Sequence, residues 1–159
     1  MIELGSALYT QLEEAARASP RGRQHYNLHA SYDAPCQKLL NALSFDSYIR
    51  PHRHSIDPKI ECIFALKGRF GCVIFDNNGR PIQNCVIGPN EFQSGIQIEP
   101  HQWHTLFALE ASGILLEIKD GPFNPNAAKE SALWAVEESD PRAALYLEEL
   151  RSLVIAPIT

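Results

Sequence analysis

The sequence lacks the features that would place this chain in a membrane or on nucleic acid. No apolar run approaches the ~20 residues that a helix needs to cross a bilayer. The start, Met1-Ile2-Glu3-Leu4, has neither the basic segment nor the apolar stretch of a signal peptide. Basic residues are not in excess, because the net charge of the 159 residues is -5. We therefore expect a cytoplasmic protein that binds neither membrane nor nucleic acid.

Cysteine is scarce, and its spacing excludes two common uses. The sequence has 4 cysteines, and none forms a Cys-x-x-Cys pair, so neither a thiolate zinc site nor a thioredoxin-like motif is indicated. The length and spacing also argue against a secreted domain built on disulfides. We expect Cys36, Cys62, Cys72 and Cys85 to be reduced residues that serve packing.

The centre of the chain, residues 36–120, has the pattern of an all-β protein. Short apolar runs alternate with turn signals, of which Asp76-Asn77-Asn78-Gly79 is the strongest. This pattern is typical of a sandwich or a barrel. The predicted strands are residues 37–43, 47–53, 60–66, 69–76, 83–87, 92–98, 103–109 and 113–119.

Helical segments flank this region. Residues 6–18 have the periodicity of an amphipathic helix that Ser19-Pro20 ends, and a second helix is predicted after Asp140-Pro141. Residues 20–32 read as a polar, basic arm that folds over a barrel mouth, stays solvated or exchanges between subunits. The length suits one domain. Its predicted parts are an N-terminal helix and arm (1–35), a barrel (36–120) and a C-terminal extension with a helix packed on the barrel (121–159).

The residues that carry chemistry are three histidines and a glutamate. His52 and His54 share one face of a predicted strand, about 7 Å apart by the strand rise. Glu61 opens the next strand, and His104 lies on a distant one. A lone histidine is more often a surface residue, but a packed core has no reason to collect four such polar groups. Three imidazoles and one carboxylate suit a single divalent first-row metal: iron, zinc, nickel, manganese or copper.

These segments resemble the two conserved motifs of the cupin superfamily. In the first motif a His-x-His pair is followed by Glu, then six residues, then Gly, as in His52-x-His54, Glu61 and Gly68. The second motif ends in a ligand histidine after a Pro- or Gly-containing turn, which His104 matches. The resemblance implies an all-β cupin barrel (a double-stranded β-helix, or jelly roll) with an N-terminal helix and a C-terminal helical extension. It also implies a homodimer.

More narrowly, the chain resembles the WbuC family of bacterial cupin-fold metalloproteins, over roughly residues 15–137. That family is associated with O-antigen gene clusters, so the resemblance implies a role in surface-polysaccharide (lipopolysaccharide) biosynthesis. The segments that carry it are Ala18-Ser19-Pro20-Arg21, Asn27-Leu28-His29, Tyr48-Ile49-Arg50-Pro51-His52-Arg53-His54, Ile74-Phe75-Asp76, Trp103-His104-Thr105 and Gly121-Pro122-Phe123-Asn124-Pro125.

Two positions depart from the cupin motifs. Six residues separate His54 from Glu61, where three or four are usual, so the loop 55–59 is predicted to bulge. His101 stands where the second motif normally has glycine. It is either an exposed turn residue, which we favour, or an additional polar group near the metal.

Strand alternation also points to two neighbours of the metal. If His52 and His54 face inward along strand 47–53, Tyr48 and Arg50 should face inward too. We therefore name both as candidate catalytic residues: Arg50 to hold an anionic group or a sugar hydroxyl, and Tyr48 to donate a hydrogen bond or a proton. The structural alternatives are an ion pair of Arg50, for instance with Glu117, and a core position for Tyr48.

Two functions fit such a site. The first is a metal-dependent enzyme acting on a small molecule such as a sugar or sugar derivative, by isomerisation or epimerisation, hydrolysis or dioxygenation. The second is a non-catalytic cupin that senses or carries a small ligand. The fold does not decide between them, because cupins support many chemistries.

Overall fold

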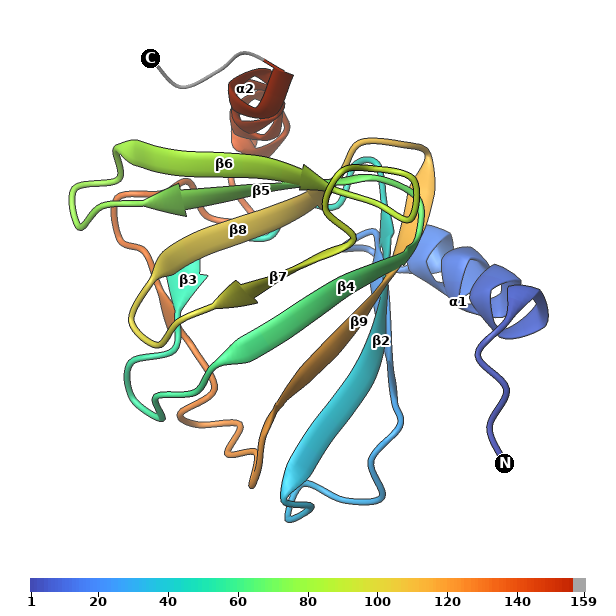
Figure 1. Ribbon diagram of the computed structural model, residues 1–159. Helices are drawn as coiled ribbons and strands as arrows, with labels where there is room; N and C mark the ends of the chain where they lie inside the picture. Colours follow the sequence, from blue (N-terminus) through green and yellow to red (C-terminus); the bar gives the residue numbers. More distant parts are fainter. Residues whose placement is uncertain (156–159) are drawn as a thin grey trace.

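Two five-stranded antiparallel sheets face each other in the computed structural model, which describes residues 1–155 (Figure 1). The first sheet has the order β1-β2-β9-β4-β7, and the second has the order β10-β3-β8-β5-β6. The strands of the first sheet are β1 (Arg23–Asn27), β2 (Cys36–Ser44), β4 (Glu61–Lys67), β7 (Gly95–Ile98) and β9 (Ser112–Asp120). Those of the second are β3 (His52–Arg53), β5 (Phe70–Phe75), β6 (Pro81–Ile87), β8 (Trp103–Ala108) and β10 (Glu130–Ser131). Apart from the consecutive pairs β1–β2 and β5–β6, neighbouring strands are far apart in the sequence, as in a jelly roll.

The main core fills the space between the two sheets. Because side chains alternate along a strand, every second residue of β4, β5 and β8 points inward. The large buried members of this core are Leu43, Ile63, Phe70, Ile87, Ile98, Leu106 and Leu115.

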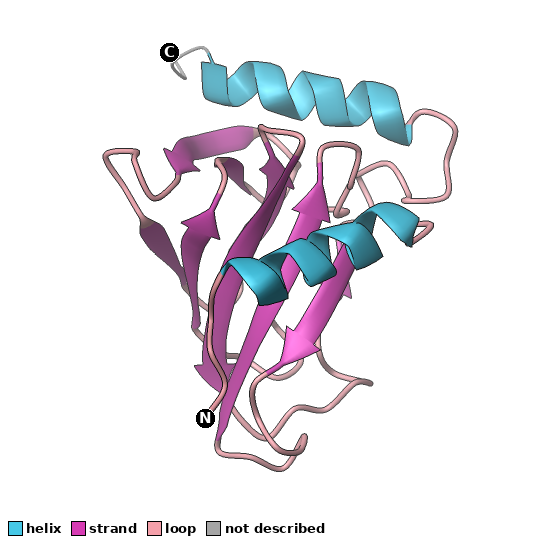
Figure 2. Ribbon diagram, turned by 90° about the vertical axis from the view of Figure 1, so that its right-hand side faces the viewer, coloured by secondary structure: helices cyan, strands magenta, loops and turns pink. Residues whose placement is uncertain are grey.

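Each helix covers the outer face of one sheet (Figure 2). Helix α1 (Ser6–Ala18) packs Leu12 and Ala16 against Leu40 and Ile114 of the first sheet. Helix α2 (Ala143–Ile155) packs Leu147 and Leu150 against the second sheet, on the side that carries Val73, Phe75 and Trp103. Burying one such leucine contributes about 1.5–3 kcal/mol, so the helices add substantially to stability.

The predicted fold class is confirmed, and so are both helices; the bounds of α1 match the prediction residue for residue. Six predicted strands are present as β2, β4, β5, β6, β8 and β9, with ends shifted by at most two residues. Of the predicted strand 92–98, only residues 95–98 form a strand, β7. The last residues of the predicted C-terminal extension, 156–159, lie outside the described residues. Within the described residues, no helix combines the length and apolarity that crossing a bilayer requires. The homodimer and the cytoplasmic location stay predictions.

Three segments differ from the prediction. Residues 23–27 of the basic arm form β1, which pairs with β2 of the same chain. The predicted strand 47–53 is ordered as a strand only at 52–53, because its carbonyl groups are used elsewhere: Ile49 accepts from Thr105 Oγ1, and Pro51 accepts from the amide of Ala132. The two-residue strand β10 was not predicted.

Candidate metal centre

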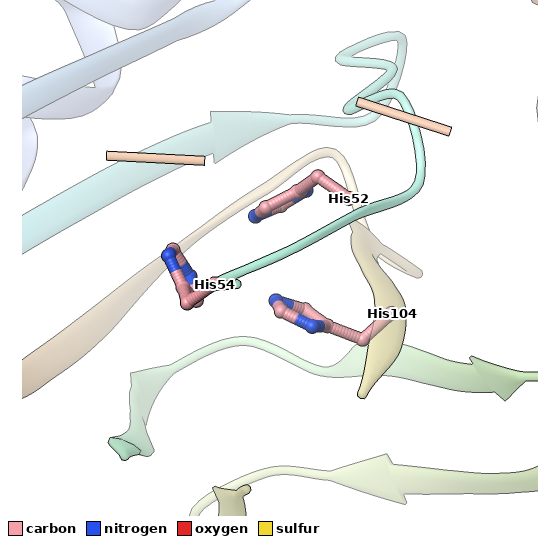
Figure 3. Close-up of side chains that lie close together, drawn as sticks. All are labelled: His52, His54 and His104. Atoms are coloured by element: carbon pink, nitrogen blue, oxygen red, sulfur yellow. The ribbon is translucent and has the colours of Figure 1, made fainter. Parts of the chain in front are cut away.

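Three histidines lie together inside the barrel, near one end of the second sheet (Figure 3). His52 and His104 are direct partners across the β3–β8 pair, and His54 follows two residues later on the same face. One ring nitrogen from each lies within 4.8 Å of the others. The strand pair therefore brings the two predicted motifs to one point.

Backbone hydrogen bonds fix the tautomer of all three rings. The Nδ1 atoms of His52, His54 and His104 lie 3.1, 2.5 and 2.9 Å from the carbonyl oxygens of Arg50, Ala128 and Gln102. A carbonyl oxygen can only accept, so each Nδ1 carries the proton and donates it. Each Nε2 therefore keeps a free lone pair, which is the form of imidazole that binds a metal.

A carboxylate oxygen of Glu61 lies beside two of these rings. Its Oε2 atom lies 3.0 Å from Nε2 of His54 and 3.4 Å from Nε2 of His104, and the carboxylate is buried. His54 Nε2 is nonetheless buried without a hydrogen-bond partner among the described residues. Two acceptors this close need a positive charge between them, which is either a second proton on His54 or a metal ion. Separations of about 3.0–3.4 Å are those of adjacent ligands on an ion with bonds of about 2.1 Å, so these residues fit a metal.

A second layer of polar groups holds Glu61 in place. The ammonium group of Lys119 lies 3.0 Å from Glu61 Oε1 and 2.5 Å from Glu117 Oε1. The other oxygen of Glu117 accepts from Asn41 Nδ2 at 2.8 Å. Burial disfavours the charged form of Lys119, but Glu117 and Glu61 raise its pKa above the ordinary value. Lys119 is therefore a charged clamp that leaves Glu61 Oε2 facing the histidines.

The pKa shifts favour a neutral His52 and an ionised Glu61, whereas His54 shifts the other way: burial would lower its pKa, but the contact with Glu61 raises it. Burial lowers the pKa of His52, and the nearby His104 and Lys129 lower it further. Burial would raise the pKa of Glu61, but contacts with His104 and His54 and the charge of Lys119 hold it well below the ordinary value. A neutral imidazole beside an ionised carboxylate is what a divalent ion requires.

The cluster opens into a cavity of about 440 Å³. Its floor is apolar, and its rim carries charged groups from the arm and from the segment before β10. A cavity of this size suits a small molecule. The apolar floor residues are Leu43, Ile49, Ile63, Leu106 and Leu115, and the rim includes Arg21, Arg23, Lys119 and Lys129.

Tyr48 and Arg50 lie outside this cavity, so their predicted placement beside the metal is wrong. Tyr48 is buried on the α2 side of the second sheet and donates its hydroxyl proton to the carbonyl of Val136 at 2.7 Å. Arg50 donates from Nε to the carbonyl of Ala132 and pairs with Glu137, not with Glu117. The alternation argument failed because residues 47–51 are not a strand.

The structure accommodates both departures from the cupin motifs without moving the neighbouring site residues apart. The segment 55–60 loops out, and Glu61 still reaches His54. His101 is exposed, has φ of 68°, and donates its backbone N–H to the carbonyl of His54. That left-handed backbone favours glycine, which explains the motif residue and makes His101 a turn residue, as we favoured.

Sequence reasoning missed Lys119, Lys129 and the inward face of β1. The signal for Lys119 was available, because Leu115, Glu117 and Lys119 alternate on one face of a predicted strand. Lys129 follows no such pattern, since it lies in an irregular segment that only the tertiary fold brings to the cavity.

The fold and the site together define a cupin-fold protein with a histidine cluster in its barrel. The solved structures that share the fold with this chain include the following three. CapF, a capsular polysaccharide assembling protein from Staphylococcus aureus, has a TM-score of 0.60 at 15% identity over 71% of this chain, which spans only 32% of the CapF chain. A cupin 2 domain-containing protein from Halorhodospira halophila has a TM-score of 0.50 at 16% sequence identity, and the match covers 86% of this chain and 83% of that chain. An oxalate oxidase has a TM-score of 0.55 at 16% sequence identity, and the match covers 85% of this chain and 73% of that chain.

The family model described as "Domain of unknown function (DUF6016)" matches residues 4–87, slightly more than half of the chain. The chain belongs to this family. The match includes the first cupin motif with His52, His54 and Glu61, whereas His104 lies beyond it. No curated protein matches the chain in sequence. Membership of the WbuC family stays a prediction.

Proposed function

We propose that this protein binds one divalent first-row transition metal through His52, His54, His104 and Glu61, and that it is a metal-dependent enzyme acting on a small molecule. The observation that carries the metal site is the cluster of three histidine ring nitrogens within 4.8 Å of one another, with a buried carboxylate oxygen beside two of the rings. The tautomers that backbone carbonyls fix make this arrangement unfavourable without a cation. Iron, zinc, nickel, manganese and copper all suit this donor set.

The arrangement supports catalysis as well as binding. A metal held here can polarise a carbonyl group or activate water or dioxygen, which covers isomerisation or epimerisation, hydrolysis and dioxygenation. The protein's own part is to orient the donors through the Nδ1 hydrogen bonds and to hold Glu61 with Lys119. The apolar floor keeps bulk water away from one side of the ligand.

A sugar or sugar derivative in surface-polysaccharide biosynthesis is the substrate that we propose. This setting rests on the resemblance to the WbuC family. CapF is described as assembling capsular polysaccharide, which is a similar setting for that protein, although its likeness to this chain extends to the fold alone.

Metal analysis tests the proposal. Protein purified without a histidine tag should contain about one equivalent of a first-row metal. A His52→Ala/His54→Ala variant should lose it, whereas the matched control His101→Ala, which removes an exposed histidine, should keep it. Full metal content in the double variant would contradict the site assignment.

A turnover screen separates enzyme from binder. Metal-loaded protein is incubated with simple sugars and nucleotide sugars, and products are followed by mass spectrometry and NMR. Turnover that disappears in the double variant supports the enzyme. Saturable binding of a sugar without turnover supports the sensor or carrier instead.

A further inference from the structure

The rim of the metal cavity is unusually rich in basic groups for this chain. Arg21 and Arg23 come from the arm and β1, Lys119 comes from β9, and Lys129 comes from the segment before β10. Among residues 1–155, two carboxylates, Glu61 and Glu117, line the same cavity. The whole chain has a net charge of -5, so the cavity is opposite in sign to the molecule.

Two of these cations are already neutralised within the protein. Arg23 contacts Glu138 at 2.6 Å and donates to the carbonyl of Tyr48 at 2.9 Å. Lys119 contacts Glu117 and Glu61. These contacts hold β1 and β9 in place and leave no free charge for a ligand.

Arg21 and Lys129 are different. Within residues 1–155, neither side chain makes a hydrogen bond or an ion pair, and both line the cavity. Lys129 is exposed, and its pKa is lowered by partial desolvation of the ammonium group and by Arg23 and Arg21, against the opposing effect of Glu138. Two cations without a direct hydrogen-bond or ion-pair partner among residues 1–155 therefore line the same cavity as the three histidines.

We propose, on the basis of the metal site above, that this cavity takes a small organic anion whose carboxylate or phosphate group lies between Arg21 and Lys129 while the rest of the molecule extends toward the histidines. A guanidinium group offers a planar pair of donors to such an oxyanion, and an ammonium group offers a point charge. With a divalent ion at the histidines, a neutral ligand would leave this positive field uncompensated.

The dimensions restrict the ligand further. The apolar floor and the volume of about 440 Å³ admit a small molecule and exclude a polymer chain. An adjoining cavity of about 260 Å³ shares His25, Asn41, Glu117 and Lys119 with the first one. These polar groups can accept and donate hydrogen bonds to hydroxyl groups, so an acidic sugar or a sugar phosphate fits better than a hydrocarbon acid.

Calorimetric titration of the zinc-loaded protein tests the inference. The probes are malonate, succinate and inorganic phosphate, and malonamide is the uncharged match of malonate. At least one anion should bind and malonamide should not. An Arg21→Gln/Lys129→Gln variant should weaken that binding at least about tenfold, since hydrogen bonds to charged groups are lost. Arg80→Gln, which removes a charge outside the cavity, should change nothing, and Lys129→Arg should retain binding.

The outcomes separate this inference from the metal site. If zinc binds but no anion does, or if the anion binds equally to the double variant, the inference is overturned and the metal site stands. If the protein binds no zinc, the proposed function fails. Titration of the metal-free protein then still shows whether Arg21 and Lys129 bind an anion.

Discussion

His52 and His104 stand directly opposite each other in the β3–β8 pair, with ring centroids 4.4 Å apart. One comes from the first predicted motif and the other from the second. Their Nδ1 atoms donate to the carbonyls of Arg50 and Gln102, each two residues earlier in the chain. The backbone therefore orients each ring locally, and the strand register brings the two rings together. The predictions below test this register and its surroundings.

Removing Lys119 should destabilise the protein. In Lys119→Met, the carboxylates of Glu61 and Glu117 lose the buried cation that lies 3.0 and 2.5 Å from them. Breaking such a buried pair costs about 3 kcal/mol of unfolding free energy. Urea unfolding in the presence of a chelator measures it. Lys38→Met, which removes an exposed lysine with no side-chain partner among residues 1–155, should cost less than about 0.5 kcal/mol. Equal stability of the two variants would refute the clamp.

Replacing His101 by glycine should stabilise the protein. A φ of 68° is strained for histidine and free for glycine, so His101→Gly should add about 0.5–1 kcal/mol. Thermal and urea unfolding measure the gain, and metal content should not change. A loss of metal in this variant would show that His101 serves the site after all.

Tyr48 should behave as a structural residue. Tyr48→Phe leaves the carbonyl of Val136 without its hydrogen bond, which costs about 1 kcal/mol of unfolding free energy. Metal content and any turnover should stay at the wild-type level, because the hydroxyl lies on the α2 side of the second sheet. A fall in turnover at full metal loading would restore the catalytic role predicted from the sequence.

Cys85 should be the most reactive of the partly buried thiols. It faces Cys72 across the β5–β6 pair, and the neighbouring Cys72 thiol lowers the pKa of Cys85 to about 7. The thiolate is the nucleophile, so alkylation should accelerate as the pH rises and level off above about 7. Mass spectrometry of peptides after iodoacetamide treatment resolves each cysteine. In Cys72→Ala the pH midpoint of Cys85 alkylation should move toward 9, and an unchanged midpoint would exclude the Cys72 thiol as the cause.

Periodicity and turn residues predicted most of this fold. Leu8, Leu12 and Ala16 recur at helical spacing, and this local pattern predicted the exact bounds of the first helix. Strand β1 could not be predicted, since its pairing with β2 depends on the tertiary fold rather than on an apolar pattern of its own. The strand expected at 47–53 has an apolar pattern but does not form over its full length. Its carbonyl groups accept hydrogen bonds from Thr105 and Ala132 instead of pairing with a neighbouring strand.

The proposed metal ligands were predictable because they occupy motif positions, and because His52 and His54, two residues apart, lie on the same face of the chain. Tyr48 and Arg50 were misplaced, because parity was extended through a segment that is not a strand. For the arm with Arg21, a position over the barrel mouth was one of three alternatives that the sequence left open. Lys129 was not assigned to the cavity, since it lies in an irregular segment whose position only the folded structure defines.

X-ray absorption spectroscopy of the metal-loaded protein tests the central claim most directly, because it reports the atoms bound to the ion. The account predicts three imidazoles and at least one oxygen donor at about 2.0–2.2 Å, with one imidazole fewer in His104→Ala. A spectrum with one imidazole or none in the wild-type protein, or a spectrum that His104→Ala leaves unchanged, would contradict it.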